Sequence, residues 1–119
     1  MEPPKNGLSQ ALEIFRELNP GVTVNEVITF LNVCEGEGLS VQELAFRSGL
    51  AEPTASRSIR SFGAAGSEWA RAPACGLVEA FVHPGDARSR VIHLTSAGRA
   101  VRDRLDSILR EASPLRARG

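Results

Sequence analysis

Residues 39–60 have the sequence LSVQELAFRSGLAEPTASRSIR, and this stretch decides the fold. It opens with Ser40 and Glu43 at the spacing of a capping box. In this motif the serine side chain accepts a hydrogen bond from the backbone N–H of the glutamate, and the glutamate side chain accepts one from the backbone N–H of the serine. Leu39 and Leu44 occupy the two positions of a hydrophobic staple. Two concordant signals at one boundary predict a helix that begins just after Ser40.

The following residues predict a turn into a second helix. Gly49 stands just beyond the expected end of the first helix, where the left-handed conformation is easiest for glycine. Proline fixes φ and disfavours helix at the residue before it, so we expect the second helix to start at Pro53 rather than at Glu52. Two short helices joined in this way form a helix-turn-helix.

The second helix would present two chemically different faces. At about 100° per residue, Ala55, Ile59 and Phe62 cluster on one face, and Arg57 and Arg60 lie roughly opposite them. A helix of this width enters the DNA major groove, where arginine bonds guanine O6 and N7. The alternative is a solvated arginine face on an ordinary surface helix. We predict DNA binding through Thr54, Ser56, Arg57, Arg60 and Ser61.

Two β-rich runs, 77–82 and 90–94, flank a turn-forming segment and predict a two-stranded wing. Pro84, Gly85 and Asp86 supply the turn chemistry. Asp86 could hold Arg88 in place while the guanidinium reaches a narrow minor groove, whose negative potential attracts arginine. The alternative is an exposed hairpin with incidental charge. The predicted wing contacts are Arg88 and Arg90, with Asp86 as support.

Three further segments have the apolar spacing of amphipathic helices. The first covers 8–18 and ends at Asn19-Pro20-Gly21. The second opens with the capping box of Thr23 and Glu26, and its apolar stripe is Val24, Val27, Ile28, Leu31 and Cys34. The third carries a narrow seam of Ala97, Val101, Leu105, Ile108 and Ala112. We expect residues 1–7 to form a flexible arm, 8–112 a single domain, and 113–119 a frayed tail.

Composition indicates an ordinary globular chain. The 119 residues carry no net charge, with 42% hydrophobic and 24% charged side chains. Residues 1–50 carry three basic and seven acidic side chains, and 51–119 carry eleven arginines and seven acids, so the basic half contains the predicted contact elements. No apolar run approaches the length of a membrane span, and the N-terminus lacks the apolar core of a signal peptide, so we expect a cytoplasmic protein that does not enter membranes.

From about Thr23 to Gly98 the sequence resembles the MarR family of winged-helix transcription regulators. The resemblance is carried, in order, by LSVQELA at 39–45, SGL at 48–50, TASR at 54–57, GLV at 76–78, DAR at 86–88 and LTSAG at 94–98. It implies a mainly α fold with a small β-hairpin wing, a homodimer, recognition helices in successive major grooves and wing arginines in the minor grooves. On this pattern Arg57 and Arg60 match recognition-helix contacts, and Arg88, braced by Asp86, matches the wing-tip arginine.

The sequence departs from the family pattern at several places. Ala51 stands where a serine is usual and Ser58 where an apolar residue is usual, which weakens the cap and the core face of the recognition helix. About ten residues, Ser67–Gly76, are inserted before the wing. The chain also ends after one C-terminal helix, where the family normally has a further long helix. We therefore expect dimerisation through the first and last helices, by Leu8, Leu12, Phe15, Val101, Leu105 and Ile108.

The insertion holds Trp69, the only tryptophan. An apolar tryptophan in a loop more often packs on its own domain than on another molecule. The alternative hypothesis is that Trp69 closes the dimer or contacts a regulatory partner.

The sequence gives no reason to expect catalysis, a metal or a cofactor. The cysteines and histidines lack the spacing of metal ligands, and the glycines form no phosphate cradle. Acids such as Glu35 and Glu37 are expected to be solvated rather than to form a catalytic pair. Cys34 reads as a buried apolar residue, with redox sensing as the alternative.

Together these features predict a homodimeric regulator that binds a specific sequence of double-stranded DNA. A winged-helix protein–protein interaction module is the alternative, favoured by the zero net charge, Glu52 and the insertion. A role in replication or plasmid maintenance is equally compatible with the DNA-binding features. The sequence does not identify a small-molecule effector.

Overall fold

The computed structural model describes residues 5–116. The predicted flexible N-terminal segment, residues 1–7, and the predicted frayed tail, residues 113–119, therefore lie partly outside the described residues, which begin at Lys5 and end at Arg116. In chain order the elements are α1 (Gly7–Leu18), α2 (Val24–Glu35), β1 (Leu39–Ser40), α3 (Val41–Ser48), α4 (Glu52–Arg60), β2 (Val78–His83), β3 (Asp86–Leu94) and α5 (Ser96–Glu111). The fold is mainly helical with a small antiparallel sheet, as expected for a winged helix-turn-helix.

Both predicted capping boxes are confirmed. In α2 the Thr23 side chain accepts from the Glu26 N–H at 3.2 Å, and the Glu26 carboxylate accepts from the Thr23 N–H at 2.7 Å. In α3 the equivalent Ser40 and Glu43 bonds are 3.1 and 3.3 Å. Each box satisfies two backbone donors that the helix itself leaves free.

The predicted turn is confirmed, but the predicted start of α4 is wrong by one residue. Gly49 has φ of 67°, in the left-handed region that glycine adopts without steric cost. The helix begins at Glu52, with Pro53 in its second position. The first turn has no intrahelical acceptor for its N–H groups, so a proline there costs no hydrogen bond. Ala51 caps the helix without a side-chain bond.

The sheet has three strands in the order β1-β3-β2, whereas the sequence predicted only the two-stranded wing. The additional strand, β1, pairs Leu39 with Ile92 and Ser40 with Val91. A two-residue strand has no periodicity to detect in a sequence, and its residues were accounted for as a staple and a cap. The strand ties the start of the helix-turn-helix to the base of the wing.

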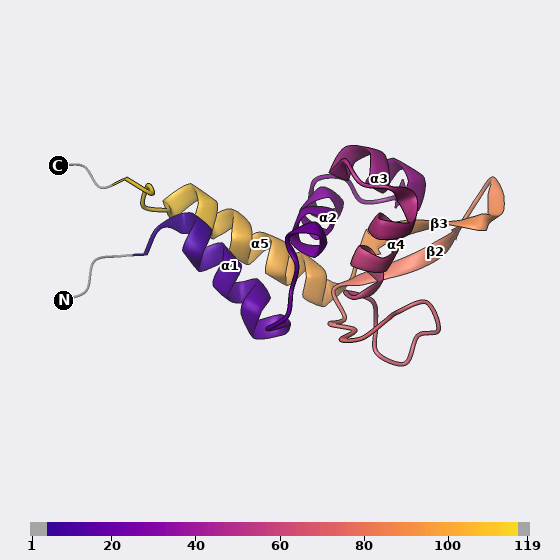
Figure 1. Ribbon diagram of the computed structural model, residues 1–119, viewed down its shortest axis with the longest axis horizontal. Helices are drawn as coiled ribbons and strands as arrows, with labels where there is room; N and C mark the ends of the chain where they lie inside the picture. Colours follow the sequence, from indigo (N-terminus) through magenta and orange to yellow (C-terminus); the bar gives the residue numbers. More distant parts are fainter. Residues whose placement is uncertain (1–4, 117–119) are drawn as a thin grey trace.

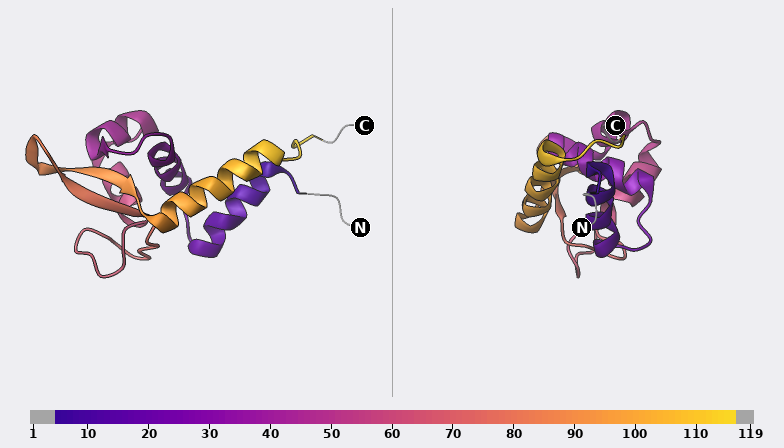
Figure 2. Two further views of the ribbon diagram at one scale, coloured as in Figure 1. Left: turned by 180° about the vertical axis from the view of Figure 1, so that it is seen from behind. Right: turned by 90° about the vertical axis from the view of Figure 1, so that its left-hand side faces the viewer.

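The first and last helices lie side by side as an arm that projects from the helix-turn-helix and points away from the wing (Figures 1 and 2). Asn6 caps α1, and the Gly7 N–H donates to the Ser113 carbonyl at 3.2 Å. A Cβ on Gly7 would lie 2.3 Å from the Ala112 Cβ, so the absent side chain allows the two helices to meet here. The elongated molecule measures 56 × 27 × 22 Å.

The core joins the arm to the helix-turn-helix through three buried aromatic rings. Phe15 of α1 packs edge-on against Phe30 of α2 at a centroid distance of 5.8 Å, and Phe30 lies 5.1 Å from Phe62. The predicted apolar stripe of α2 is only partly correct. Val27 and Cys34 are partly buried and pack against the core, whereas Val24, Ile28 and Leu31 are exposed. The fully buried residues of the helix are Thr29, Phe30 and Val33.

No helix among residues 5–116 is long and apolar enough to cross a membrane.

Candidate nucleic-acid interface

Helix α4 separates its faces as its sequence predicts. Ala55 and Ile59 are fully buried against the core. Ser58 is also buried where an apolar side chain would fill the space. Arg57 is exposed, and Thr54 and Ser56 are partly exposed on either side of it. The exposed surface of α4 thus offers one guanidinium flanked by two hydroxyl groups.

Ser61 is not part of this surface, so its predicted DNA contact is wrong. Only 2% of the residue is exposed, and its hydroxyl donates to the Ser58 carbonyl at 2.7 Å. Ser61 keeps helical backbone angles, with φ of −66° and ψ of −18°, and lies beside the buried Ser58. Its carbonyl accepts from the Cys75 N–H, so the inserted segment covers it. The hydroxyl bond satisfies a polar group in a buried place.

Arg60 has a structural contact that the sequence did not suggest. Its Nε donates to the carbonyl of Trp69 at 2.5 Å, and the guanidinium is partly buried. The predicted pair of free arginines is therefore unequal: Arg57 is exposed, and Arg60 is held at one nitrogen by the inserted segment.

The insertion is anchored to the end of α4 rather than hanging from it. Backbone N–H groups of Arg71, Cys75 and Gly76 donate to the carbonyls of Arg60, Ser61 and Gly63 at 3.0 to 3.1 Å. A Cβ on Gly63 would lie 2.7 Å from the Ala70 Cβ, so glycine permits the close approach. The segment is visible below α4 in Figure 1. Trp69 is half-buried and packs against the core, as the intrachain reading predicts.

The wing is a hairpin with a two-residue turn, Pro84-Gly85, between β2 and β3. Asp86 accepts a hydrogen bond from the backbone N–H of Arg88 at 2.9 Å, so it fixes the backbone of that residue and leaves the guanidinium exposed. The Arg90 guanidinium instead donates to the carbonyls of Ala87 and Ser89, both at 3.3 Å. Arg88 is therefore the freer of the two predicted wing contacts.

A groove of about 610 Å³ separates the N-terminal half of α4 from the wing. Its lining brings together Ser56, Arg88 and Arg90, three of the predicted contact residues, with Trp69 of the insertion. Glu52 and Asp86 also line it. On the other flank of α4, a groove of about 260 Å³ contains Thr54, Arg57 and Arg71. Arg71 was not predicted as a site residue, because its approach to α4 depends on the path of the insertion.

The predicted dimerisation residues divide into two groups. Phe15 and Leu105 lie in the core of the chain, and Val101 and Ile108 are partly buried against it, so these four hold α1 to α5 within one molecule. Leu8 is 63% exposed and Leu12 is 44% exposed. Leu109 on α5 is also exposed and was not predicted. The apolar surface of the arm is therefore carried by Leu8, Leu12 and Leu109, and the seam of α5 faces inward.

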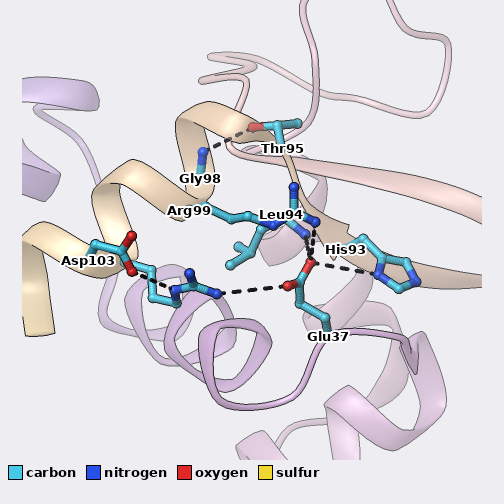
Figure 3. Close-up of polar contacts among 8 residues, drawn as sticks. Glu37, His93, Leu94, Thr95, Gly98, Arg99 and Asp103 are labelled. Atoms are coloured by element: carbon cyan, nitrogen blue, oxygen red, sulfur yellow. Dashed lines mark hydrogen bonds and ion pairs between the residues drawn. The ribbon is translucent and has the colours of Figure 1, made fainter.

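Glu37 forms a polar cluster that connects the loop before β1 to the junction of β3 and α5 (Figure 3). Its carboxylate accepts from the Leu94 N–H at 2.8 Å and from Arg99 at 3.1 Å, and lies 3.7 Å from His93 Nδ1. Partial burial opposes ionisation, but the Leu94 hydrogen bond and Arg99 outweigh it and lower the pKa of Glu37. Glu37 is exposed, as expected, but its carboxylate is paired with groups that the sequence did not indicate.

Neither cysteine has the surroundings of a reactive thiol. Burial raises the pKa of Cys34 to about 12, and burial also raises the pKa of Cys75. Because the thiolate is the reactive form, a raised pKa disfavours the redox reading of Cys34. Cys34 lines a groove of about 280 Å³ between α2 and α5. Among residues 5–116 no group of three or more His, Cys, Asp or Glu side chains could hold a metal ion.

Comparison of the sequence with models of known protein families gives no match, and no curated protein matches it either. Solved structures do match. The S. aureus MepR–DNA complex is 22% identical with a TM-score of 0.66, over 88% of this chain and 74% of that one. Reduced AbfR bound to DNA is 16% identical with a TM-score of 0.64, over 92% and 66%. E. coli MarR is 14% identical with a TM-score of 0.60, over 88% and 72%.

These matches extend across most of the chain. The chain therefore has the winged-helix fold of the MarR-family transcriptional regulators.

Proposed function

We propose that this protein is a homodimeric transcription regulator that binds a specific DNA sequence, with α4 in the major groove and the wing in the adjacent minor groove. The observation that carries the proposal is the exposed face of α4. Arg57 projects from it between Thr54 and Ser56, while Ala55 and Ile59 fix the opposite face in the core. An exposed arginine on a helix that is itself packed against the core is suited to bidentate contact with guanine, worth about 1–3 kcal/mol of discrimination per base pair.

The wing supports the same proposal. Asp86 holds the Arg88 backbone, and the Arg88 guanidinium is exposed near the tip of the hairpin. A narrow minor groove attracts arginine through its negative potential. The groove between α4 and the wing would follow the phosphate backbone that separates the two DNA grooves. Among the solved structures with this fold, MepR, CouR and AbfR were crystallised with DNA.

A homodimer is proposed from the arm. Leu8, Leu12 and Leu109 are exposed on two adjacent helices, and apolar side chains of this kind are available to pack against a second copy. Two-fold symmetry of the protein would require a near-palindromic operator, with half-sites about one helical turn apart. Leu12→Asp should convert a dimer to a folded monomer in sedimentation-velocity ultracentrifugation. A wild-type protein that sediments as a monomer at micromolar concentration would exclude this part of the proposal.

Selection from a randomised duplex library tests the DNA-binding part. The wild-type protein should enrich a two-fold symmetric site after several rounds, and Arg57→Ala, with an unchanged circular dichroism spectrum, should not. Failure of the folded wild-type protein to enrich any sequence at low salt would reject the proposal.

That outcome would favour the protein–protein interaction module. Phe46 on α3 is 89% exposed, which is unusual for a phenylalanine and is the feature of the described surface that best fits a protein partner. Partner binding that survives the double substitution Arg57→Ala and Arg60→Ala would establish this alternative.

A further inference from the structure

We infer that the insertion between α4 and β2 is a third DNA-binding element, and that Arg71 binds a backbone phosphate next to the base contacts of Arg57. This inference rests on the proposed function and adds to it a contact outside the recognition helix and the wing. The side chain is that of Arg71, and the end of α4 fixes the position of the segment that carries it.

The backbone of the insertion holds Arg71 in a fixed place. The Arg71 N–H donates to the Arg60 carbonyl at 3.0 Å, and the Arg71 carbonyl accepts from the Ala74 N–H at 2.9 Å. The Arg60 side chain meets the same segment from the other direction, through its 2.5 Å bond to the Trp69 carbonyl. Residues 69–71 are thus fastened to the last turn of the recognition helix by its backbone and by one of its side chains.

This anchoring brings Arg71 to the same groove as Arg57. The two arginines, with Thr54 and Ser58, line the 260 Å³ groove on the flank of α4 that lies away from the wing. Both arginines are exposed, and neither forms a salt bridge with another described residue. The groove has room for an anion, and neither of the two guanidinium groups that line it is engaged in an ion pair with a described residue.

The remaining charge in the groove does not cancel this pair. Glu26 also lines the groove, but one of its carboxylate oxygens already accepts from the Thr23 N–H in the capping box of α2. Two guanidinium groups and one carboxylate leave an excess of one positive charge. Hydroxyl groups of Thr23 and Thr54 offer further donors.

A DNA phosphate fits this arrangement better than a base does. When α4 occupies the major groove, residues along its flanks face the phosphates that form the groove walls. Guanidinium groups bind phosphate oxygens in pairs of parallel hydrogen bonds. Such contacts position the protein without reading sequence, so Arg71 should increase affinity for all duplexes about equally.

The salt dependence of binding to the selected site tests this assignment. Each lost phosphate contact reduces the slope of log Kobs against log salt by about 0.9, so Arg71→Ala should reduce it by about 2 for a dimer. The preference for the selected site over a scrambled duplex should stay at the wild-type value. Arg71→Lys, which keeps the charge, should retain most of the slope.

Arg104→Ala is the matched control, because Arg104 is an exposed arginine on α5 and its removal changes the net charge equally. A slope for Arg71→Ala that equals that of wild type or of Arg104→Ala overturns the inference, while the proposed function stands if wild type still prefers the selected site. Wild-type protein that shows no such preference rejects the proposed function instead. Thermal melts of each variant show whether it is folded.

Discussion

The contact between α5 and the base of the wing depends on the absence of one side chain. A Cβ on Gly98 would lie 1.9 Å from the Leu77 carbonyl oxygen, whereas ordinary contacts begin at 3.4 Å, so Gly98→Ala requires a separation of about 1.5 Å. The Leu77 carbonyl also accepts from the Thr95 N–H at 3.0 Å. Separation would strain or break this bond as well as the packing around it.

The expected loss of stability follows from three contributions. Overpacking costs about 1–3 kcal/mol, and the loss of one backbone hydrogen bond costs about 1 kcal/mol. Alanine recovers about 0.5–1 kcal/mol through its better helix propensity. Gly98→Ala should therefore lower the free energy of unfolding by about 2 kcal/mol, which corresponds to a Tm lower by about 5–10 °C for a chain of this size.

Equilibrium urea unfolding followed by circular dichroism measures this difference. Gly21→Ala is the control, because its Cβ would meet nothing closer than Asn19 Oδ1 at 3.6 Å. That variant should lie within about 0.5 kcal/mol of wild type or be slightly more stable. If Gly98→Ala is as stable as Gly21→Ala, the close approach of α5 to β2 does not constrain this position and the reasoning fails.

Three further outcomes are expected. Glu37→Gln should destabilise the fold by about 1 kcal/mol at pH 7. Because the folded pKa of Glu37 is lowered, its contribution is complete above the unfolded pKa of about 4.3 and is lost as pH falls through the folded value. The stability difference between variant and wild type in urea titrations should therefore shrink as pH is lowered below the unfolded pKa, and a difference that does not shrink contradicts this. Alkylation of Cys34 at pH 8, monitored by mass spectrometry, should be on the order of 100-fold slower in the native protein than in urea, because burial raises the pKa of Cys34 to about 12. Equal alkylation rates in the two conditions would show that Cys34 is a reactive thiol. Arg60→Ala should increase the rate of tryptic cleavage after Arg71 by about 5-fold, because loss of the Arg60–Trp69 hydrogen bond makes local opening of the insertion easier. An unchanged cleavage rate would mean that this hydrogen bond does not hold the insertion.

The features that could be predicted from the sequence are those determined within a few residues. Both capping boxes and the left-handed Gly49 depend on side chains three or four positions apart, and the structure confirms them. The buried face of α4 was also predicted, because an amphipathic helix on the surface of one core follows a simple period. Local chemistry and helical period together were enough to predict a winged helix-turn-helix.

The features that were missed depend on contacts distant in the sequence. Strand β1 exists because Leu39 and Ser40 meet β3, about fifty residues later. The buried face of α2 packs against Phe15 of α1 and against Phe62, which follows α4, so only part of the predicted apolar stripe meets the core.

Site residues were mispredicted for the same reason. Ser61 and Arg60 both meet an insertion whose path no periodicity describes: the Ser61 carbonyl accepts from the Cys75 N–H, and the Arg60 side chain donates to the Trp69 carbonyl. The pairing of Glu37 was missed because its partners Leu94 and Arg99 are 57 and 62 residues away.

The most direct test of the account compares the affinity of the protein for a selected duplex with its affinity for a scrambled duplex of the same composition, for wild type and for Arg57→Ala, at one salt concentration. If Arg57 reads a base pair in each half-site, the substitution should lower the ratio of the two affinities by about 30-fold or more while non-specific binding changes little. An unchanged ratio, with the variant still folded and dimeric, would show that α4 does not read the sequence through Arg57.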